Sequence, residues 1–329
     1  MSSGSLTFGV LGTAGIARTA FVPAVAASDH TVGAVASRDG DQAADFAEAH
    51  SIPRSYGSYA ALLDDDGIDA VYVPLPNALH AEWTTRAADA GLDVLCEKPL
   101  AADADEAREV VDHCADRGVT LMEGYMYRYH PRTERAVELA ETALDEVRSV
   151  TATFRFPLYD RPDDVRLDLT LAGGSLMDVG CYPVSIARRL LGSPDHVYAH
   201  AHDSRDAGVD TELAGVLGYD DGRSARIASG FDTQLIQRYR VDATNGWIDV
   251  ERAFDAPNDE STTLEYRIDG RHATETFDPV DQYRLEVEHF ADCVERGETP
   301  RTNGSEAVRT LEIIDALAES ASEAGMVRL

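Results

Sequence analysis

The sequence has almost no lysine: Lys98 is the one lysine among its 29 lysines and arginines. Lysine is ordinarily one of the commonest residues in proteins. An ammonium group can shift its pKa and exchange protons, whereas a guanidinium stays charged. We therefore expect Lys98 to be kept for chemistry that arginine cannot supply. The alternative is a chance survivor in a lysine-poor set of proteins.

Cysteines are few and long apolar runs are missing. The four cysteines, Cys96, Cys114, Cys181 and Cys293, lie far apart without a CxxC pair. This spacing argues against a disulfide framework or a zinc site and predicts reduced, buried thiols in a cytoplasmic protein. No run approaches the ~18 apolar residues of a membrane span. Residues 1–4 do not begin a basic segment followed by an apolar one, so we expect no signal peptide.

Positive charge is scarce as well. Against 59 acidic residues the chain has 29 basic ones, which gives a formal net charge of −30. Such a charge opposes binding to nucleic acids or to anionic membranes. The acidic excess is spread along the chain, and runs such as Asp64-Asp65-Asp66 are expected to be solvated faces.

The length of 329 residues and the 44% hydrophobic content predict a globular protein of about two domains. In the first part, short apolar strands alternate with helices, which is typical of a parallel, doubly wound sheet. We therefore assign residues 1–124 to a Rossmann domain that binds a dinucleotide. Strands are expected at Leu6–Leu11, Thr31–Ala36, Ile68–Val73, Asp93–Cys96 and Val119–Glu123, with helices over 41–50, 78–90 and 103–117.

A glycine turn follows the first strand, with the sequence Gly12, Thr13, Ala14, Gly15, Ile16 and Ala17. It is a variant dinucleotide fingerprint in which Ala14 replaces the second glycine and Ala17 stands at the third position. Glycine permits the tight turn, and small residues let the backbone approach a pyrophosphate at a helix N-terminus. Residues 12–16 are thus predicted to bind the cofactor. A βα turn that merely carries glycines is the alternative.

The second strand ends in Ser37, Arg38 and Asp39. An acid at this place commonly binds the ribose of NAD, whereas an arginine accommodates the 2′-phosphate of NADP. Ser37 and Arg38 therefore favour NADP, although Asp39 leaves NAD open. Arg38 could instead only stack on adenine.

Two further segments follow strands of the same predicted sheet, and ligands bind at the carboxyl edge of such sheets. One contains Pro74, Leu75, Asn77 and His80, and the other contains Glu97 and Lys98. We predict that these six residues lie near the cofactor. Asn77 could instead cap the next helix, and His80 could be a packing residue.

The remaining residues, 125–329, are assigned to an α+β domain for substrate binding and oligomerisation. Its longer strands and hairpin turns predict a large, mostly antiparallel open sheet, with helices on one face and a second subunit on the other. Strands are expected over 147–156, 196–201, 212–219, 223–230, 238–243, 265–268 and 274–277, and closing helices over 280–295 and 305–323. The aromatic stretch at 125–130 is read as the crossover between domains, and its rings could pack against a sugar or only form core.

Before that sheet, Gly173 and Gly174 introduce a helical segment over 176–191 that Pro183 interrupts. It carries Asp178 and Tyr182 four residues apart, and positions i and i+4 share one helix face. Both side chains could therefore address one cleft. A capped helix with a buried tyrosine is the alternative.

Together these motifs resemble the glucose–fructose oxidoreductase/inositol dehydrogenase/MocA family over nearly the whole chain. The motifs are Gly12-x-Ala14-x-x-Ala17, Glu97-Lys98-Pro99 and Gly173-Gly174-x-x-x-Asp178-x-Gly180-x-Tyr182. Segments 74–83, 126–131 and 178–183 look most like its dimeric dihydrodiol dehydrogenase and D-xylose dehydrogenase branch. The inositol dehydrogenase branch usually carries histidine where Tyr182 stands, so the resemblance argues against an inositol substrate.

The resemblance implies oxidation of an aldose such as D-xylose at C1 to the lactone, with NADP as the cofactor. Tyr182 is the implied general base, assisted by Lys98, because a nearby cation lowers the pKa of a phenol from its usual value of about 10. Glu97 would orient Lys98 or hold the nicotinamide ribose, and the Lys98–Pro99 peptide is expected to be cis. Asp178 would bind a sugar hydroxyl. Pocket residues are expected among Tyr125, Arg128 and Tyr129.

Other readings stay open. The same residues could oxidise trans-dihydrodiols or reduce a sugar or other carbonyl with NADPH, and a sugar or nucleotide sensor without turnover is a reading of another class. No metal is expected. A homodimer or homotetramer is expected through the second sheet, since symmetric dimers are the commonest oligomers.

The acidic composition predicts a requirement for salt. Like the acidic, lysine-poor proteins of salt-accumulating haloarchaea, which the composition resembles, this chain repels itself at low ionic strength, and molar salt shortens the Debye length to about 3 Å. We expect the melting temperature and the activity to rise steeply with KCl concentration up to the molar range. A melting temperature and activity that are unchanged at low salt would contradict this prediction.

Overall fold

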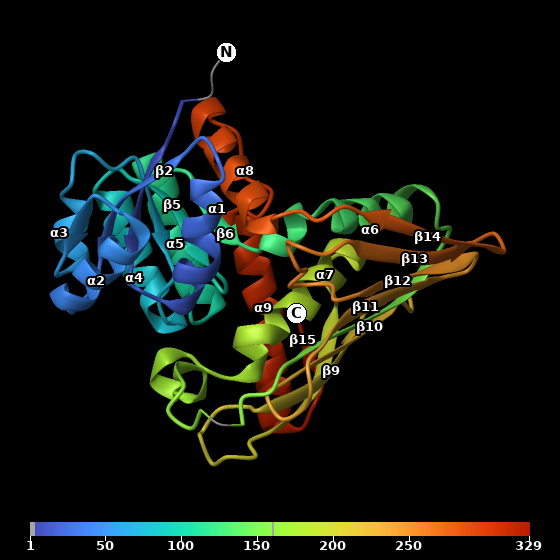
Figure 1. The fold of residues 1–329 in the computed structure, drawn as a ribbon. Coiled ribbons are helices and arrows are strands. Elements are labelled where there is room, and N and C mark those ends of the chain that lie inside the picture. The colour runs from blue at the N-terminus through green and yellow to red at the C-terminus, as the bar shows by residue number, and fades with distance from the viewer. Residues whose placement is uncertain (1–3, 160) are drawn as a thin grey trace. The chain divides into compact units, whose positions relative to one another are not determined.

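The computed structural model describes residues 4–159 and 161–329, which form two compact units (Figure 1). The first contains the chain up to Met126 together with Tyr283–Val308, and the second contains Tyr127–Gln282 and Arg309–Leu329. The division at 124/125 drawn from the sequence differs in that it leaves segment 283–308 in the second domain. This segment packs in the first unit, where Phe290 lies against Phe8 with ring centroids 5.9 Å apart. None of the described helices is long and apolar enough to cross a membrane.

The first unit contains a six-stranded parallel sheet in the order β3-β2-β1-β4-β5-β6. This order confirms the predicted doubly wound sheet, in which the ligand crevice lies where the order reverses, beside the carboxyl ends of β1 and β4. The strands are β1 (Thr7–Leu11), β2 (Thr31–Ala36), β3 (Arg54–Tyr56), β4 (Ala70–Val73), β5 (Asp93–Glu97) and β6 (Leu121–Gly124).

Helices flank this sheet, and its central strands are almost fully buried, as expected where both faces are covered. Phe21 packs edge-on to Phe8 and stacks on Tyr72 at 3.8 Å, which joins the first helical segment to the sheet. The helices are α1 (Val22–Ala26), α2 (Gly40–His50), α3 (Tyr59–Leu63), α4 (His80–Asp89), α5 (Ala104–Arg117) and α8 (Gln282–Arg296).

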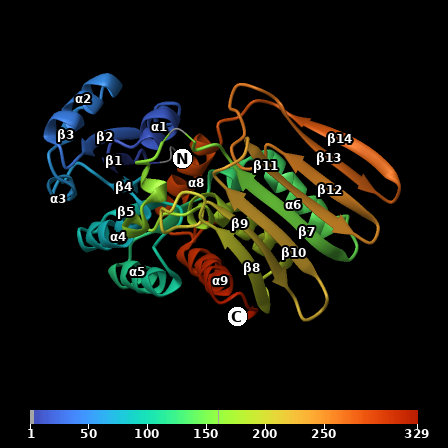
Figure 2. The ribbon, with the colours of Figure 1, turned by 90° about the horizontal axis from the view of Figure 1, so that it is seen from below.

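The second unit contains a nine-stranded sheet in the order β14-β13-β12-β11-β7-β10-β9-β8-β15, and Figure 2 shows its strands from β14 to β8. All neighbouring strands are antiparallel except β7 and β10, so the predicted mostly antiparallel sheet is confirmed. The strands are β7 (Val147–Arg155), β8 (His196–His202), β9 (Glu212–Gly218), β10 (Ser224–Gly230), β11 (Ile236–Ala243), β12 (Gly246–Glu251), β13 (Thr262–Ile268), β14 (Arg271–Phe277) and β15 (Val327–Arg328).

Two strands and one α-helix of this unit were not predicted. β12 follows β11 through a two-residue turn at Thr244 and Asn245, and the Asn245-Gly246 pair is a hairpin signal that the sequence reading passed over. β15 is only two residues long. The third is α6 (Pro131–Thr142), which begins with a proline that suits the first helical position and with His130 as its N-cap.

Helices pack on one face of the second sheet. Along β7, Val150, Ala152 and Phe154 are buried while Thr151 and Thr153 between them remain partly exposed. The covering elements include α6, α7 (Cys181–Leu191) and α9 (Gly304–Glu323). The alternation confirms a half-buried sheet with one face left open in the described chain.

The segment over 176–191 is not one α-helix. A π-helical turn at Leu176–Gly180 precedes α7, so the change of helix type falls before Pro183. Pro183 lacks the amide that would bond back four residues, and a wider turn accommodates it. The expectation that Asp178 and Tyr182 share one α-helical face therefore rested on the wrong helix type.

A half-buried carboxylate, Asp210, fixes the start of this segment. Its Oδ2 accepts hydrogen bonds from the Ser175 hydroxyl at 2.6 Å and from the Leu176 amide at 2.9 Å. Amides at a helix N-terminus have no partner within the helix, and a negative charge is favoured there. Gly174 has φ +114, and a Cβ on it would lie 2.4 Å from Asp210 Oδ1. The chain can therefore pass this close to the carboxylate only as glycine.

Asp210 gives the free energy of unfolding a pH dependence. Burial raises the pKa of Asp210 to about 6, against hydrogen bonds from Ser175 and Leu176 that lower it. The native state thus binds this proton more tightly than the unfolded chain does. The stability that protonated Asp210 contributes is lost as the pH rises from about 4 to about 6. We measure the free energy of unfolding by urea titration at molar KCl. As the pH rises from about 4 to about 6, we expect that of Asp210→Asn to increase by up to about 3 kcal/mol relative to that of the wild type.

The exposed Asp66 provides a control, since Asp66→Asn should follow the wild-type curve. Wild-type and Asp210→Asn curves that run parallel over the interval would contradict the prediction.

Candidate active site

The fingerprint loop has the backbone that a close ligand approach requires. Gly12 has φ +115, and a Cβ on it would lie 3.2 Å from Leu75 Cδ2. Its amide donates to the Ala36 carbonyl at 2.8 Å, which ties the end of β1 to the end of β2. Nothing lies within 4 Å of the Cβ position of Gly15, and Gly15 is exposed. Together with the partly exposed Thr13, Ala14 and Ile16, this loop fits a dinucleotide at the carboxyl edge of the sheet.

The end of β2 distinguishes between the two possible nicotinamide cofactors. Asp39 caps α2: its carboxylate accepts hydrogen bonds from the amides of Asp41 and Gln42 at 3.0 and 3.3 Å and from the Gln42 side chain at 3.2 Å. These bonds occupy the acid that would have to bind a ribose. Arg38 is exposed. Ser37 is buried, and its hydroxyl accepts a hydrogen bond from the Asp39 amide.

Arg38 also lies near the fingerprint loop. It interacts with the hydroxyl of Tyr59, and its charge opposes the burial that raises the pKa of that phenol. The Tyr59 hydroxyl is in turn 3.9 Å from the Cβ position of Gly12. A guanidinium beside the glycine turn is placed where the 2′-phosphate of a dinucleotide is usually bound.

The Lys98–Pro99 peptide is cis, as the family resemblance predicted. Two buried side chains hold the backbone that follows it. His80 contacts the Pro99 carbonyl through Nδ1 at 2.7 Å, and Glu123 Oε1 accepts the Leu100 amide at 2.9 Å. The loop that carries Lys98 is therefore fixed from the interior of the first unit.

His80 supports a second loop as well. Its Nε2 lies 2.7 Å from the Leu75 carbonyl, in the loop after β4. A neutral imidazole has one N–H, so it donates a hydrogen bond to one of the two carbonyls and only contacts the other. Burial lowers the pKa of His80 to about 4, with a further lowering from the charge of Lys98, while the two carbonyl contacts act in the opposite direction. The side chain is 0% exposed, so any influence of His80 on a cofactor passes through these loops.

Asn77 does not cap α4, which was the alternative to its predicted contact with the cofactor. It begins a 3₁₀ turn at Asn77–Leu79, and α4 starts after it without a side-chain cap. Asn77 is partly exposed beside the buried Pro74 and Leu75, so the structure leaves its predicted contact with a cofactor possible.

Glu97 ends β5 and accepts a 2.6 Å hydrogen bond from the Tyr72 hydroxyl. Burial and the Glu97 carboxylate both raise the pKa of Tyr72. The sequence reading missed both Tyr72 and Glu123. The available signal was a polar group inside a buried strand, because such groups need hydrogen-bond partners.

In the second unit, Asp178 pairs with an arginine that the sequence reading also missed. Arg166 Nε donates to Asp178 Oδ2 at 2.7 Å, and Arg166 Nη1 donates to Asp164 Oδ1 at 3.2 Å. The Asp178 carboxylate contributes most to raising the pKa of Arg166. The structure thus turns a lone predicted acid into one member of an ionic triplet.

Tyr182 lies four residues further on, 4% exposed and surrounded by aromatic rings. The rings of Tyr127, Phe154 and Phe254 have their centroids 5.7, 5.2 and 5.5 Å from its own. This packing limits the directions from which water can reach the ring.

The other predicted pocket residues come from the connection after β6. Arg128 and Tyr129 belong to a 3₁₀ turn at Met126–Tyr129 and are 7% and 4% exposed, and Tyr125 before it is 2% exposed. These values fit the alternative in which the aromatic stretch forms core.

Over 4–159 and 161–329, no group of three or more His, Cys, Asp or Glu side chains is placed to hold a metal ion. The four cysteines are unpaired by disulfides and buried, as predicted.

The chain is similar to known proteins along most of its length. Residues 6–125 match an oxidoreductase family with an NAD-binding Rossmann fold, and residues 137–249 match the GFO/IDH/MocA C-terminal domain. D-xylose 1-dehydrogenase (NADP(+)) 2 of Haloferax volcanii is 55% identical over 98% of this chain and 100% of its own. Trans-1,2-dihydrobenzene-1,2-diol dehydrogenase of Xenopus laevis is 31% identical over 91% of each chain.

A solved structure agrees with these relatives. The 3-ketoreductase from Actinomadura kijaniata, crystallised with NADP and TDP-benzene, matches with a TM-score of 0.90 at 31% identity, over 96% of this chain and 98% of that one. Both parts of the chain therefore match one family in sequence and in fold. The chain belongs to the glucose–fructose oxidoreductase/inositol dehydrogenase/MocA family of oxidoreductases.

Proposed function

We propose that the protein is an NADP-dependent aldose 1-dehydrogenase that oxidises a pentose, D-xylose, to its lactone. The observation that carries this proposal is the 55% identity, over nearly the full length of both chains, to a D-xylose 1-dehydrogenase that uses NADP. The chain also has the lysine, acid and phenol that this reaction needs, at Lys98, Asp178 and Tyr182.

The end of β2 supports NADP. Asp39 is engaged in capping α2, and Arg38 is exposed near the glycine turn. The residues that would hold the dinucleotide are the loop over 12–16 with Ser37 and Arg38, and near the nicotinamide Pro74, Leu75, Asn77, Glu97 and Lys98. When bound, NADP supplies the nicotinamide ring that takes up the hydride from C1 of the sugar.

The chain's own side chains move the proton. Tyr182 accepts the proton of the C1 hydroxyl as that carbon becomes the lactone carbonyl, and its aromatic surroundings limit the access of water. An ammonium group near a phenol favours the phenolate, and this is the role of Lys98. The Lys98 backbone is suited to that task because His80 and Glu123 fix the loop around it. Asp178 accepts a hydrogen bond from another hydroxyl of the sugar.

Removal of the acid–base pair should stop turnover. We expect Tyr182→Phe and Lys98→Ala each to lower kcat with D-xylose by about 10² to 10⁴-fold, the usual contribution of a positioned acid or base. NADPH absorbance in molar KCl measures the rate, and fluorescence titration should show NADPH binding to Tyr182→Phe within about twofold of the wild type.

The matched control for Tyr182→Phe is Tyr198→Phe, which removes the hydroxyl of a half-exposed tyrosine on the open sheet face. This variant should retain wild-type kcat. A Tyr182→Phe or Lys98→Ala enzyme with a third of the wild-type activity would refute the role of that residue.

Arg38 should set the cofactor preference. We expect Arg38→Ala to raise the KM for NADP about tenfold or more and to change the KM for NAD little, because a charged hydrogen bond to phosphate contributes about 1.5–3 kcal/mol. Steady-state kinetics with both cofactors measure the ratio. Arg86→Ala is the control, since Arg86 stacks on Trp83 and is also exposed. Equal losses with NADP and NAD would exclude a 2′-phosphate contact.

A second candidate function has support from the same comparisons. Relatives at 31% identity include a trans-1,2-dihydrobenzene-1,2-diol dehydrogenase and a 3-ketoreductase. Assays with D-xylose, D-glucose, L-arabinose, D-galactose and a trans-dihydrodiol distinguish these activities. Turnover of the diol without turnover of any aldose would favour a trans-dihydrodiol dehydrogenase.

The open face of the second sheet supports a homodimer or homotetramer. Its strands carry arginines (Arg155, Arg226, Arg238, Arg240, Arg267 and Arg328) and a similar number of acids (Glu212, Asp242, Asp249, Glu251 and Glu265), although the whole chain has a charge of −30. Tyr198 and Val216, paired across β8 and β9, add exposed apolar surface. A balanced surface avoids the repulsion that two copies would otherwise meet. The four buried thiols support a reducing compartment such as the cytoplasm.

A further inference from the structure

Arg166 lies in an ionic triplet with Asp164 and Asp178. The guanidinium bonds to one carboxylate through Nε at 2.7 Å and to the other through Nη1 at 3.2 Å. Its side chain is 39% exposed, while those of Asp164 and Asp178 are 10% and 14% exposed. The pair with Asp178 is therefore sheltered on the acid side and open on the arginine side.

The backbone of Arg166 is docked on the same segment. The Arg166 carbonyl accepts the Gly174 amide at 2.8 Å. A Cβ on Gly173 would lie 2.5 Å from that carbonyl oxygen, so a larger residue at 173 would push the segments around 166 and 173 apart. Part of the requirement for two glycines before Asp178 is thus a requirement for contact with Arg166.

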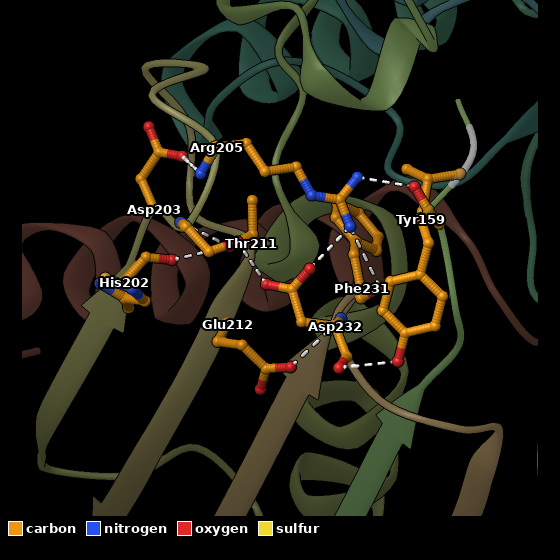
Figure 3. Close-up of polar contacts among 10 residues, drawn as sticks. Tyr159, His202, Asp203, Arg205, Thr211, Glu212, Phe231 and Asp232 are labelled. Carbon is orange, nitrogen blue, oxygen red and sulfur yellow. Dashed lines mark hydrogen bonds and ion pairs between the residues drawn. The ribbon is translucent and has the colours of Figure 1, made fainter. Parts of the chain in front are cut away.

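The loop that brings Arg166 to this place is also tied down at its start. Arg205 donates to the Leu158 carbonyl at 2.7 Å and to Asp232 Oδ1 at 2.6 Å, and Tyr159 donates to the Asp232 carbonyl at 2.9 Å (Figure 3). Figure 3 shows the Arg205 guanidinium between the Asp232 carboxylate and the chain next to Tyr159. Residues of the loops that follow β8 and β10 therefore hold the chain at Leu158 and Tyr159, and the Gly173-Gly174 turn holds it at Arg166.

We propose that Arg166 is a positioning residue that orients the Asp178 carboxylate to accept a hydrogen bond from a substrate hydroxyl. This inference rests on the proposed function, in which Asp178 contacts the sugar. Arg166 acts through Asp178 and does not itself touch the reacting carbon. Its planar fork fixes the direction of the carboxylate bond, and its second bond to Asp164 fixes the fork.

A lysine would keep the charge and lose the fork, because its ammonium is a point charge on a flexible stem. The ring of Phe156 lies 5.8 Å from the guanidinium carbon and adds a flat surface that favours arginine. Geometry as well as charge is therefore expected to matter at this position.

A double-mutant cycle tests the proposal. The variants are Arg166→Gln, Asp178→Asn and the double variant, with Arg166→Lys as the conservative replacement and Arg161→Gln as the control. Arg161 lies on the same loop and faces the same Asp164 at 3.8 Å, but it is 71% exposed. Steady-state kinetics with D-xylose give KM and kcat, and fluorescence titration gives the Kd for NADPH.

We expect Arg166→Gln to raise the KM for D-xylose about tenfold or more, with the Kd for NADPH within about twofold of the wild type. Arg166→Lys should recover part of this loss. The double variant should equal Asp178→Asn, because a residue that acts only through Asp178 has nothing further to lose when that acid is removed. Arg161→Gln should match the wild type.

Two results would overturn the inference. One is wild-type KM in Arg166→Gln, and the other is a double variant whose loss is the product of the two single losses. If Arg166→Gln fails to fold in urea titrations, a folded Arg166→Lys with wild-type KM overturns it equally. Absence of D-xylose turnover in the wild type sinks the proposed function separately. The cycle is then run with the sugar that does turn over or, failing any, by calorimetric titration of D-xylose into NADPH-saturated protein.

Discussion

Buried polar side chains that bond to loop backbone hold the functional residues of this protein in place. Next to Lys98, the buried imidazole of His80 contacts the Pro99 carbonyl, and the buried carboxylate of Glu123 accepts a hydrogen bond from the Leu100 amide. A buried polar group without a partner costs about 1–3 kcal/mol, so each side chain and the loop group that it bonds stabilise one another.

The second unit uses the same principle with charged groups. Asp210 binds the first amides of the π-helical turn, and Arg166 binds Asp178 within it. Glycines at 173 and 174 make room for these contacts, because a Cβ at either position would meet the Arg166 carbonyl or the Asp210 carboxylate. The two glycines of the GG…D pattern are therefore needed where one segment of the chain passes close to another, as well as for the proposed role of Asp178.

Surface charge acts on a different scale from these local bonds. The excess of acids lies on solvated faces, whereas the open face of the second sheet is balanced between arginines and acids. Arginine suits this balance because its fork pairs with carboxylates, as in Arg240 with Asp242 and Asp249. A chain with one lysine thus relies on guanidinium–carboxylate pairs in both units, and Lys98 stands apart in having been kept as an ammonium.

Much of the fold could be predicted from the sequence, because its signals are local. Apolar runs bounded by glycine turns gave the parallel sheet of the first unit, and alternation gave most strands of the second. Residue type and spacing also singled out Gly12, Lys98, Asp178 and Tyr182 as candidate site residues, and their roles stay predictions. The tertiary structure alone decided the π-helical turn, the placement of 283–308 in the first unit, and the partners Glu123, Arg166 and Asp210. Each of those partners lies at least 12 residues from the group that it holds, and only folding brings such distant positions within hydrogen-bond distance.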